Sequence, residues 1–370
     1  MDRKIKPLGI VERFLDHLYR IDNVIVPYVI DTNLVKCFID QSFCAQMGES
    51  TQFRFSLHPA DFERIIKIDH LFSTLSDSTI FYETEGYVFL VSKIINYFDY
   101  WYFDSIPYPF ETEPMAVLTP LAQEMLIGKR TVYSDRDPVA FLAQLQRSKF
   151  LNCNRSFYEK LETDIPGYWR IRSFIPIEFL DSLAALRNLL YSVGVFPFLH
   201  GGTLLGWYRE CRILPHTTDV DLIFQASELS AQFEQLLYSL RKPPCTVLKV
   251  FGFFNDSYQV QLFCRGGVRL DLEPVYQDQK CRVGISTEPC DWMGGTSNGT
   301  EKYKYTYRFA SHSQICSADL GGYLFFVPCQ TEEILDGTYG TSWRFSVDAK
   351  YDWKNSPKNI HRVADWRKAF

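Results

Sequence analysis

Residues 195–210 of the chain read VFPFLHGGTLLGWYRE, and residues 219–224 read DVDLIF. The first five residues of this stretch are apolar and short enough for a buried strand, and the pair Gly201-Gly202 follows them closely. Thr203 is a favourable N-cap for a short helix that ends near residue 210. The second run, after a loop, predicts another strand. A strand, a helix and a strand in this order begin an α/β or α+β domain with a mixed sheet.

The predicted domain extends in both directions from this stretch. Pro176 opens a helix whose apolar residues recur at the helical period, and Gly194 closes it. Further strands are predicted at residues 247–254, 258–264 and 268–276. We therefore assign residues 170–370 to one α/β (α+β) domain built on a mixed sheet.

Residues 1–152 mix short strand-like and helical runs and predict a smaller α/β domain. The expected elements are a buried strand at 24–30, a hairpin at 79–91 and a helix at 138–150. Carboxylates, histidines and glycine turns do not gather here in a pattern that chemistry needs. We expect this part to serve assembly or acceptor presentation. The polar stretch 152–172 is the predicted boundary, and a chain of 370 residues suits two domains.

Composition narrows the class of protein. Apolar residues make up 46% and charged residues 22%, as in a folded protein, and the net charge of −5 argues against a nucleic-acid partner. No apolar window is long enough for a membrane span, and the first residues do not form a signal peptide. Ten cysteines without a C-x-x-C pair and three N-x-S/T sequons favour a secretory lumen, with Cys281 and Cys290 left as candidates for a looser metal site.

Three aspartates carry the predicted chemistry. Alternation along a strand places Asp219 and Asp221 on one face, and it places Arg269, Asp271 and Glu273 on one face of a later strand. Neighbouring carboxylates repel each other, and a divalent cation removes that conflict. Hard oxygen ligands suit Mg²⁺ or Mn²⁺. A third carboxylate from a neighbouring strand would complete a site for phosphoryl transfer.

The glycine pair strengthens this interpretation. A lone D-x-D is common and usually lies on a surface strand or loop. Gly201 and Gly202, at a strand-to-helix turn, let the backbone approach a phosphate closely, with helix N–H groups directed at the anion. A glycine pair, then D-x-D, then an aspartate on a later strand is the layout of nucleotidyltransferase-like domains.

The same segments resemble the LicD/fukutin family. The resemblance lies in GTLLGWYRE at residues 202–210, DVDL at 219–222, YGTSW at 339–343 and YDWKNSP at 351–357, and it is most specific from about residue 176 onward. One departure is Thr217-Thr218, where members of the family often carry additional acidic residues before the D-x-D.

This resemblance implies a nucleotidyltransferase-like fold and a metal-dependent phosphotransferase. The enzyme would pass ribitol 5-phosphate from CDP-ribitol, or a related CDP-activated donor, to a glycan hydroxyl on a glycoprotein in protein O-mannosylation. A Golgi location, membrane association and other glycosyltransferases as partners are implied as well. The residues that carry over are Asp219, Asp221 and Asp271 as catalytic metal ligands for Mg²⁺ or Mn²⁺, with Gly201, Gly202 and Arg209 as donor-phosphate contacts. Glu273 is an outer candidate for the base that takes the acceptor proton.

Other functions stay open at this point. One is a phosphocholine transferase of the LicD type, and another is a glycosyltransferase that uses D-x-D to hold a nucleotide sugar. A third is a non-catalytic partner that helps other glycan enzymes to assemble. Three converging carboxylates argue against the third, because burying them without a metal is destabilising. His200 and His216 are interpreted as structural residues, and Trp207 and Tyr208 as packing aromatics.

Overall fold

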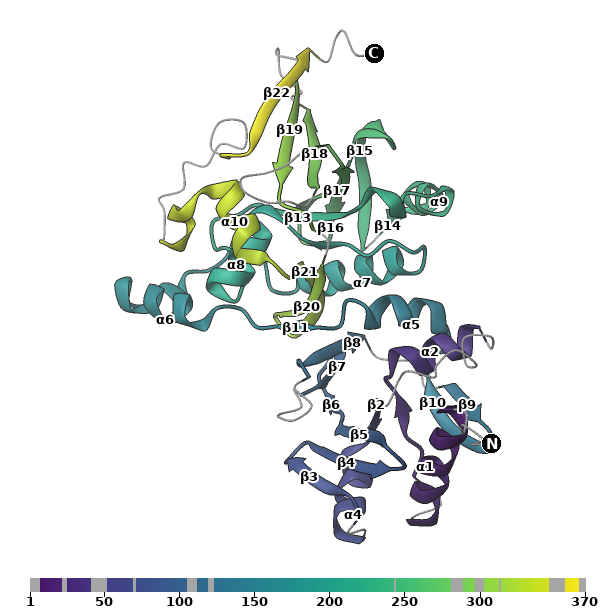
Figure 1. Cartoon of the computed structure of the whole chain (residues 1–370). Helices are drawn as coiled ribbons and strands as arrows, with labels where there is room; N and C mark the ends of the chain where they lie inside the picture. Colours follow the sequence, from purple (N-terminus) through teal and green to yellow (C-terminus); the bar gives the residue numbers. More distant parts are fainter. Residues whose placement is uncertain are drawn as a thin grey trace. The chain divides into compact units, whose positions relative to one another are not determined.

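A computed structural model gives the structure of the chain. It describes residues 7–21, 25–40, 52–68, 71–104, 112–118, 123–242, 244–280, 289–296, 303–312, 314–345 and 357–365. Contacts divide the chain into two units, residues 1–150 and 151–370, whose elements are labelled in Figure 1. Val24, Cys281, Asn298 and residues 351–356, which the predictions above include, lie outside the described residues.

The first unit is built on a mixed seven-stranded sheet in the order β3-β4-β5-β2-β1-β10-β9, with a separate antiparallel sheet β6-β7-β8. Its helices are α1 (Pro7–Ile21), α2 (Thr32–Ile39), α4 (Pro59–Ile68) and α5 (Pro138–Leu145). Its strands are β1 (Tyr28–Val29), β2 (Gln52–Leu57), β3 (Ser73–Ser76), β4 (Thr79–Thr84), β5 (Tyr87–Lys93), β6 (Ile95–Asn96), β7 (Tyr100–Phe103), β8 (Met115–Leu118), β9 (Gln123–Ile127) and β10 (Arg130–Ser134).

Local sequence explains the elements of this unit that were predicted. The hairpin β4–β5 turns at Glu85-Gly86, where both residues adopt a positive φ. Asp137 caps α5 by accepting hydrogen bonds from two backbone N–H groups of its first turn, which is why the helix begins at Pro138. Phe14 of α1 stacks on Phe89 of β5, with ring centroids 4.2 Å apart, in a core rich in aromatic side chains. The predicted strand at 24–30 is shorter than expected, because only β1 pairs within it.

The second unit contains one large mixed sheet. Along this sheet the order is β20-β21-β12-β13-β17-β16-β15-β14, and β18, β19 and β22 continue from β17. Its strands are β12 (Phe198–Leu199), β13 (Asp219–Gln225), β14 (Arg241–Lys242), β15 (Cys245–Phe253), β16 (Asp256–Cys264), β17 (Val268–Asp278), β18 (Cys290–Thr296), β19 (Tyr303–Phe309), β20 (Ile315–Leu320), β21 (Tyr323–Pro328) and β22 (Ile360–Asp365), with β11 (Phe150–Leu151) at the boundary of the units. Its helices are α6 (Arg155–Asp164), α7 (Phe179–Tyr191), α8 (Gly201–Glu210), α9 (Ala231–Ser239) and α10 (Thr331–Tyr339).

The strand–helix–strand segment at 195–224 has the predicted order of elements, but α8 begins at Gly201 with His200 at its N-cap position, so the prediction that Thr203 caps this helix is wrong. It forms β12, α8 and β13, and β12 pairs antiparallel with β13 but parallel with β21, so the sheet is mixed. Trp207 on α8 is fully buried, and its indole N–H donates a hydrogen bond to the carbonyl of Asp319 at 2.9 Å. The apolar face of β13 and the buried side of α8 belong to the same core. The domain therefore packs around the helix that begins at Gly201.

The predicted boundary stretch 152–172 is not a linker. It contains α6, and the disulfide Cys153–Cys211 joins the segment before α6 to the residue that follows α8. Residues 151–172 therefore belong to the second unit, because α6 packs against α8 and is tied to it covalently. The polar composition of this stretch reflects the exposed face of a surface helix.

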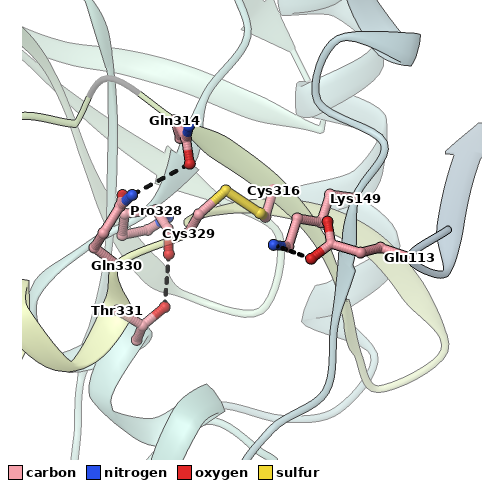
Figure 2. The surroundings of a disulfide bond; sticks show 8 residues. All are labelled: Glu113, Lys149, Gln314, Cys316, Pro328, Cys329, Gln330 and Thr331. Atoms are coloured by element: carbon pink, nitrogen blue, oxygen red, sulfur yellow. Dashed lines mark hydrogen bonds and ion pairs between the residues drawn. A yellow bond between two sulfur atoms is a disulfide. The ribbon is translucent and has the colours of Figure 1, made fainter. Parts of the chain in front are cut away.

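The cysteines in the described part of the chain form disulfide bonds. Besides Cys153–Cys211, bonds join Cys245–Cys264 across β15 and β16 and Cys316–Cys329 across β20 and β21. Figure 2 shows the last of these beside Thr331, whose hydroxyl donates to the carbonyl of Pro328 at 2.7 Å. Cys290 is disulfide-bonded as well, so the suggestion that it helps to bind a metal is wrong.

Removing the bond Cys153–Cys211 is expected to lower the free energy of unfolding by about 2–4 kcal/mol, because the bond closes a long loop. Its cysteines are 58 residues apart, whereas Cys316 and Cys329 are 13 apart within a hairpin. A Cys153→Ser/Cys211→Ser protein should therefore unfold at lower denaturant than a Cys316→Ser/Cys329→Ser protein. Equal midpoints in chemical denaturation would show that loop length does not govern these bonds.

Candidate functional site

The pairing of β13 with β17 brings the predicted carboxylates together. These strands run parallel, and the register places Asp221 opposite Asp271, Asp219 opposite Arg269 and Ile223 opposite Glu273. Residues opposite each other on adjacent strands point to the same face, about 5 Å apart. The acidic side chains at 219, 221, 271 and 273 therefore share one face of the sheet, and Val220, Leu222, Leu270 and Leu272 fill the core on the other. We call these four the acidic cluster.

Burial makes the acidic cluster electrostatically strained. It raises the pKa of Asp221 well above its ordinary value, and the charges of Asp219 and Asp271 raise it further. Burial also raises the pKa of Glu273 well above its usual range, with Asp271 as the next cause. Asp271 has a raised pKa for the same primary reason. Arg269, opposite Asp219 on the same face, lowers the pKa of Asp271 but does not offset the effect of burial.

The start of α8 lies directly against Asp221. Gly201 adopts φ +52°, and a Cβ placed on it would lie 2.5 Å from Oδ2 of Asp221. The backbone N–H of Gly202 donates a hydrogen bond to the Asp221 carboxylate. The Asp221 N–H in turn donates to the hydroxyl of Thr203 at 3.0 Å, and its carbonyl accepts from the His200 N–H at 3.1 Å. The glycine turn and the D-x-D motif are therefore one structural unit. Position 201 requires glycine because its backbone has a positive φ and because a side chain there would collide with Asp221.

Replacing Gly201 by Ala is expected to reduce both stability and activity. The left-handed backbone costs a non-glycine residue about 1–2 kcal/mol, and the added methyl group must displace the Asp221 carboxylate. Gly194→Ala is the matched control, because Gly194 has φ +77° but nothing within 4 Å of the added Cβ. Both variants should melt lower, and only Gly201→Ala should lose catalytic turnover. Equal turnover in the two variants would separate Gly201 from the site.

Two residues beside the acidic cluster orient its carboxylates. Thr217 donates a hydrogen bond from its hydroxyl to Oδ1 of Asp219 at 3.2 Å. Gln261 on β16 donates from Nε2 to Oδ1 of Asp271 at 3.1 Å. Thr217 thus has a polar role next to the D-x-D. Hydrogen bonds that donate to a carboxylate favour its charged form and fix its direction.

The glutamines of β16 are site residues that the sequence prediction missed. The side-chain amide of Gln259 donates a hydrogen bond to the Glu273 carboxylate, as that of Gln261 does to Asp271. The antiparallel register places Gln261 opposite Asp271. Their spacing puts both amides on one face of the predicted strand 258–264, which is the signal that could have found them. Only the pairing of β16 with β17 shows that this face is the acidic one.

Arg209 does not reach the carboxylates. Its guanidinium donates to the carbonyl of Trp343 at 2.9 Å and to the side chain of Glu210 at 2.6 Å, and the residue is buried. Gly201 and Arg209 are eight positions apart on α8, which separates them by about 12 Å along the helix axis. These contacts hold the Arg209 side chain at the far end of the helix, and its contact with donor phosphates stays a prediction.

His200 and its neighbours form a buried layer under the site. Burial lowers the pKa of His200 to about 3, with His312 as a second cause. His312 lies nearby, with ring centroids 6.4 Å apart, and its Nδ1 is 3.0 Å from the carboxylate of Asp291. A neutral, enclosed His200 agrees with its interpretation as a structural residue. Trp207 also packs in the core, as expected.

The donor set of the acidic cluster fits a hard divalent cation. Carboxylate oxygens are the ligands that Mg²⁺ and Mn²⁺ prefer, and the raised pKa values mark the charge that a cation would neutralise. Within the described residues, no three His, Cys, Asp or Glu side chains already converge on one point as metal ligands. One carboxylate oxygen of Asp221 faces the start of α8, where it lies against Gly201.

Comparisons with known proteins agree with this geometry. Residues 194–330 match the nucleotidyltransferase domain described as LicD/FKTN/FKRP. Two uncharacterized proteins of Caenorhabditis elegans are 32% and 30% identical over 260 and 264 residues, covering 70% of this chain and 65% and 64% of theirs. Ribitol-5-phosphate transferase FKTN of Homo sapiens is 27% identical over 261 residues, covering 70% of this chain and 53% of its own. The matched region is less than two thirds of the length of each relative.

Proposed function

Because the chain belongs to the LicD/FKTN/FKRP family, we propose that its second unit transfers an alditol phosphate from a CDP-activated donor to a glycan hydroxyl. The observation that carries the proposal is the parallel register in which Asp221 lies opposite Asp271, with Asp219 on the same strand and face. Ribitol 5-phosphate is the proposed group, since a relative bears the name ribitol-5-phosphate transferase.

Each side chain of the acidic cluster has a proposed role. Asp219, Asp221 and Asp271 hold Mg²⁺ or Mn²⁺, and the bound cation supplies neutralising charge to the donor diphosphate. Thr217 and Gln261 direct two of these carboxylates by donating hydrogen bonds to them. Gly201 has no side chain and so leaves room for the Asp221 carboxylate. These residues are rigidly placed by strands and by the start of a helix, which is what positioning catalysis requires.

The transfer itself is a substitution at phosphorus. The acceptor hydroxyl oxygen forms a bond to the phosphorus of the alditol phosphate, the bond from that phosphorus to the bridging oxygen breaks, and CMP leaves with the electron pair. Glu273, on the same face two positions after Asp271, is the proposed group that takes the hydroxyl proton at its carboxylate oxygen. In-line geometry and charge stabilisation are the main contributions that a protein makes to this kind of step.

A secretory compartment, the Golgi in this family, is the proposed location. Three described disulfides support an oxidising lumen. The sequon at Asn255 lies in the exposed turn between β15 and β16, where a glycan can be attached. Among the helices in the described ranges, none has the length and apolarity to cross a membrane. Glycoproteins are the proposed acceptors, and the first unit is proposed to present them or to bind other glycosyltransferases.

A donor screen tests the proposed function. The full chain is incubated with Mg²⁺ and each of CDP-ribitol, CDP-glycerol, CDP-choline and UDP-sugars, and release of CMP or UDP is followed. We expect CMP from a CDP-alditol, loss of that signal with a chelator and recovery with Mn²⁺. Release of UDP alone would favour a D-x-D glycosyltransferase. CMP from CDP-choline alone would favour the phosphocholine reaction. Without nucleotide release from any donor, the non-catalytic partner role would replace the proposal.

A further inference from the structure

The sheet face that carries the acidic cluster continues across two more strands with a different character. Antiparallel pairing places Phe263 opposite Arg269 and Gln261 opposite Asp271, and on the next strand Lys249 lies opposite Gln261. Since opposite residues share a face, Arg269, Phe263 and Lys249 lie on the same side of the sheet as the aspartates. We call these three residues the basic strip. A β-bulge between Val247 and Lys249 sets the register that gives Lys249 this position.

Exposure distinguishes the basic strip from the acidic cluster. Phe263 is 45% exposed, and Arg269 and Lys249 are exposed as well, whereas the residues at 221 and 273 are half-buried. Phe263 is an exposed aromatic ring opposite Arg269 and diagonal to Lys249, and the core lies on the other face of these strands, at Leu262 and Leu270. The basic strip is therefore available to a ligand that reaches the acidic cluster.

The charges point to the class of that ligand. A diphosphate next to four carboxylates needs more positive charge than one divalent cation supplies. Arg269 lies opposite Asp219 on the neighbouring strand, so the basic strip and the acidic cluster adjoin each other on this face. Phe263 lies on the strand next to Arg269, about 5 Å from it, and Lys249 lies two strands from Asp271, about 10 Å away. A flat ring on Phe263 could thus be joined through phosphates to a cation at the aspartates.

We propose that the basic strip binds the nucleoside diphosphate half of the donor, with the pyrimidine ring stacked on Phe263 and the phosphates bound by Arg269 and Lys249. This inference rests on the proposed function, because it takes the donor to be CDP-activated. The guanidinium is suited to phosphate recognition by its fork of N–H donors. The aromatic face accepts a base with little cost in ordering, since a side chain on a strand is already held.

Calorimetric titration of the full chain with CDP and with inorganic pyrophosphate, both in Mg²⁺, separates these roles. Phe263→Leu should weaken CDP binding about tenfold and leave pyrophosphate binding unchanged, because only CDP carries a base. Arg269→Gln should weaken both ligands about tenfold or more. Lys249→Gln should also weaken both, by a smaller factor. The matched controls are Phe253→Leu, 55% exposed at the end of β15, and Arg265→Gln, exposed in the β16–β17 turn, and both should bind as the unaltered chain does.

The outcomes distinguish this inference from the proposed function. If the unaltered chain binds CDP and the strip variants bind it equally well, the basic strip is wrong and the proposed function stands. If Phe263→Leu weakens CDP and pyrophosphate alike, the ring supports the fold and does not stack on the base, which also overturns the inference. If the unaltered chain does not bind CDP in Mg²⁺, the donor class is wrong and both proposals fail.

Discussion

Replacing Asp221 by Asn is expected to lower the rate of CMP release by about 10²–10³-fold, or about 3–4 kcal/mol, while the protein stays at least as stable. Asn keeps the shape of the side chain and removes one unit of negative charge from the cation site. The rate falls because the charge that the cation balances grows as CMP leaves. Stability holds or rises because burial and two neighbouring carboxylates already disfavour the charged form of Asp221.

The measurement is CMP release from a CDP-alditol donor beside thermal melting with and without Mg²⁺. Asp278→Asn is the matched control, since Asp278 ends β17 at the surface and caps the turn at Lys280. The control should keep its turnover. A lower melting temperature together with unchanged CMP release in Asp221→Asn would make Asp221 a structural residue, and the site assignment would be wrong.

Combining Asp221→Asn with Asp271→Asn is expected to cost little more than the worse single variant. The two residues lie opposite each other on β13 and β17 and are proposed to hold one cation, so removing either should disable the same element. Groups that act as a unit give non-additive losses. Independent residues would instead multiply two losses of about 10²–10³. A double-mutant cycle in kcat/KM measures the difference, and a product of the two single effects would show that the aspartates do not share a function.

Alternation of side chains along single strands explains why part of the site could be predicted from the sequence. Parity along a strand fixes the face of Asp219 with Asp221, and of Asp271 with Glu273, without knowledge of the partner strand. Gly201 was recognisable because a glycine pair at a strand-to-helix turn has few other uses. The fold of residues 195–224 followed from the same local signals. The hairpin at β4–β5 and the helix α5 were likewise marked by their turn and cap residues.

Other features depended on contacts between distant segments. The family resemblance predicts Arg209 as a phosphate contact, whereas its hydrogen bonds to the carbonyls of residues 343 and 345, at the opposite end of α8 from Gly201, could not be predicted from the sequence. Gln259 and Gln261 gain their meaning only from the antiparallel register of β16 with β17. The basic strip depends on that register and on the bulge in β15. The polar stretch at 152–172 contains α6. It belongs to the second unit because the disulfide Cys153–Cys211 and the packing of α6 against α8 hold it there.

The proposed function requires that the face of β13 and β17 bind a divalent cation for a nucleotide donor. Mn²⁺ binding to the full chain, followed by the electron paramagnetic resonance signal of free Mn²⁺, tests it most directly. We predict saturable binding that tightens when CDP is added and is lost in Asp221→Asn and Asp271→Asn but kept in Asp278→Asn. Equal Mn²⁺ binding by the unaltered chain and the two site variants, or no effect of CDP on it, would contradict the claim.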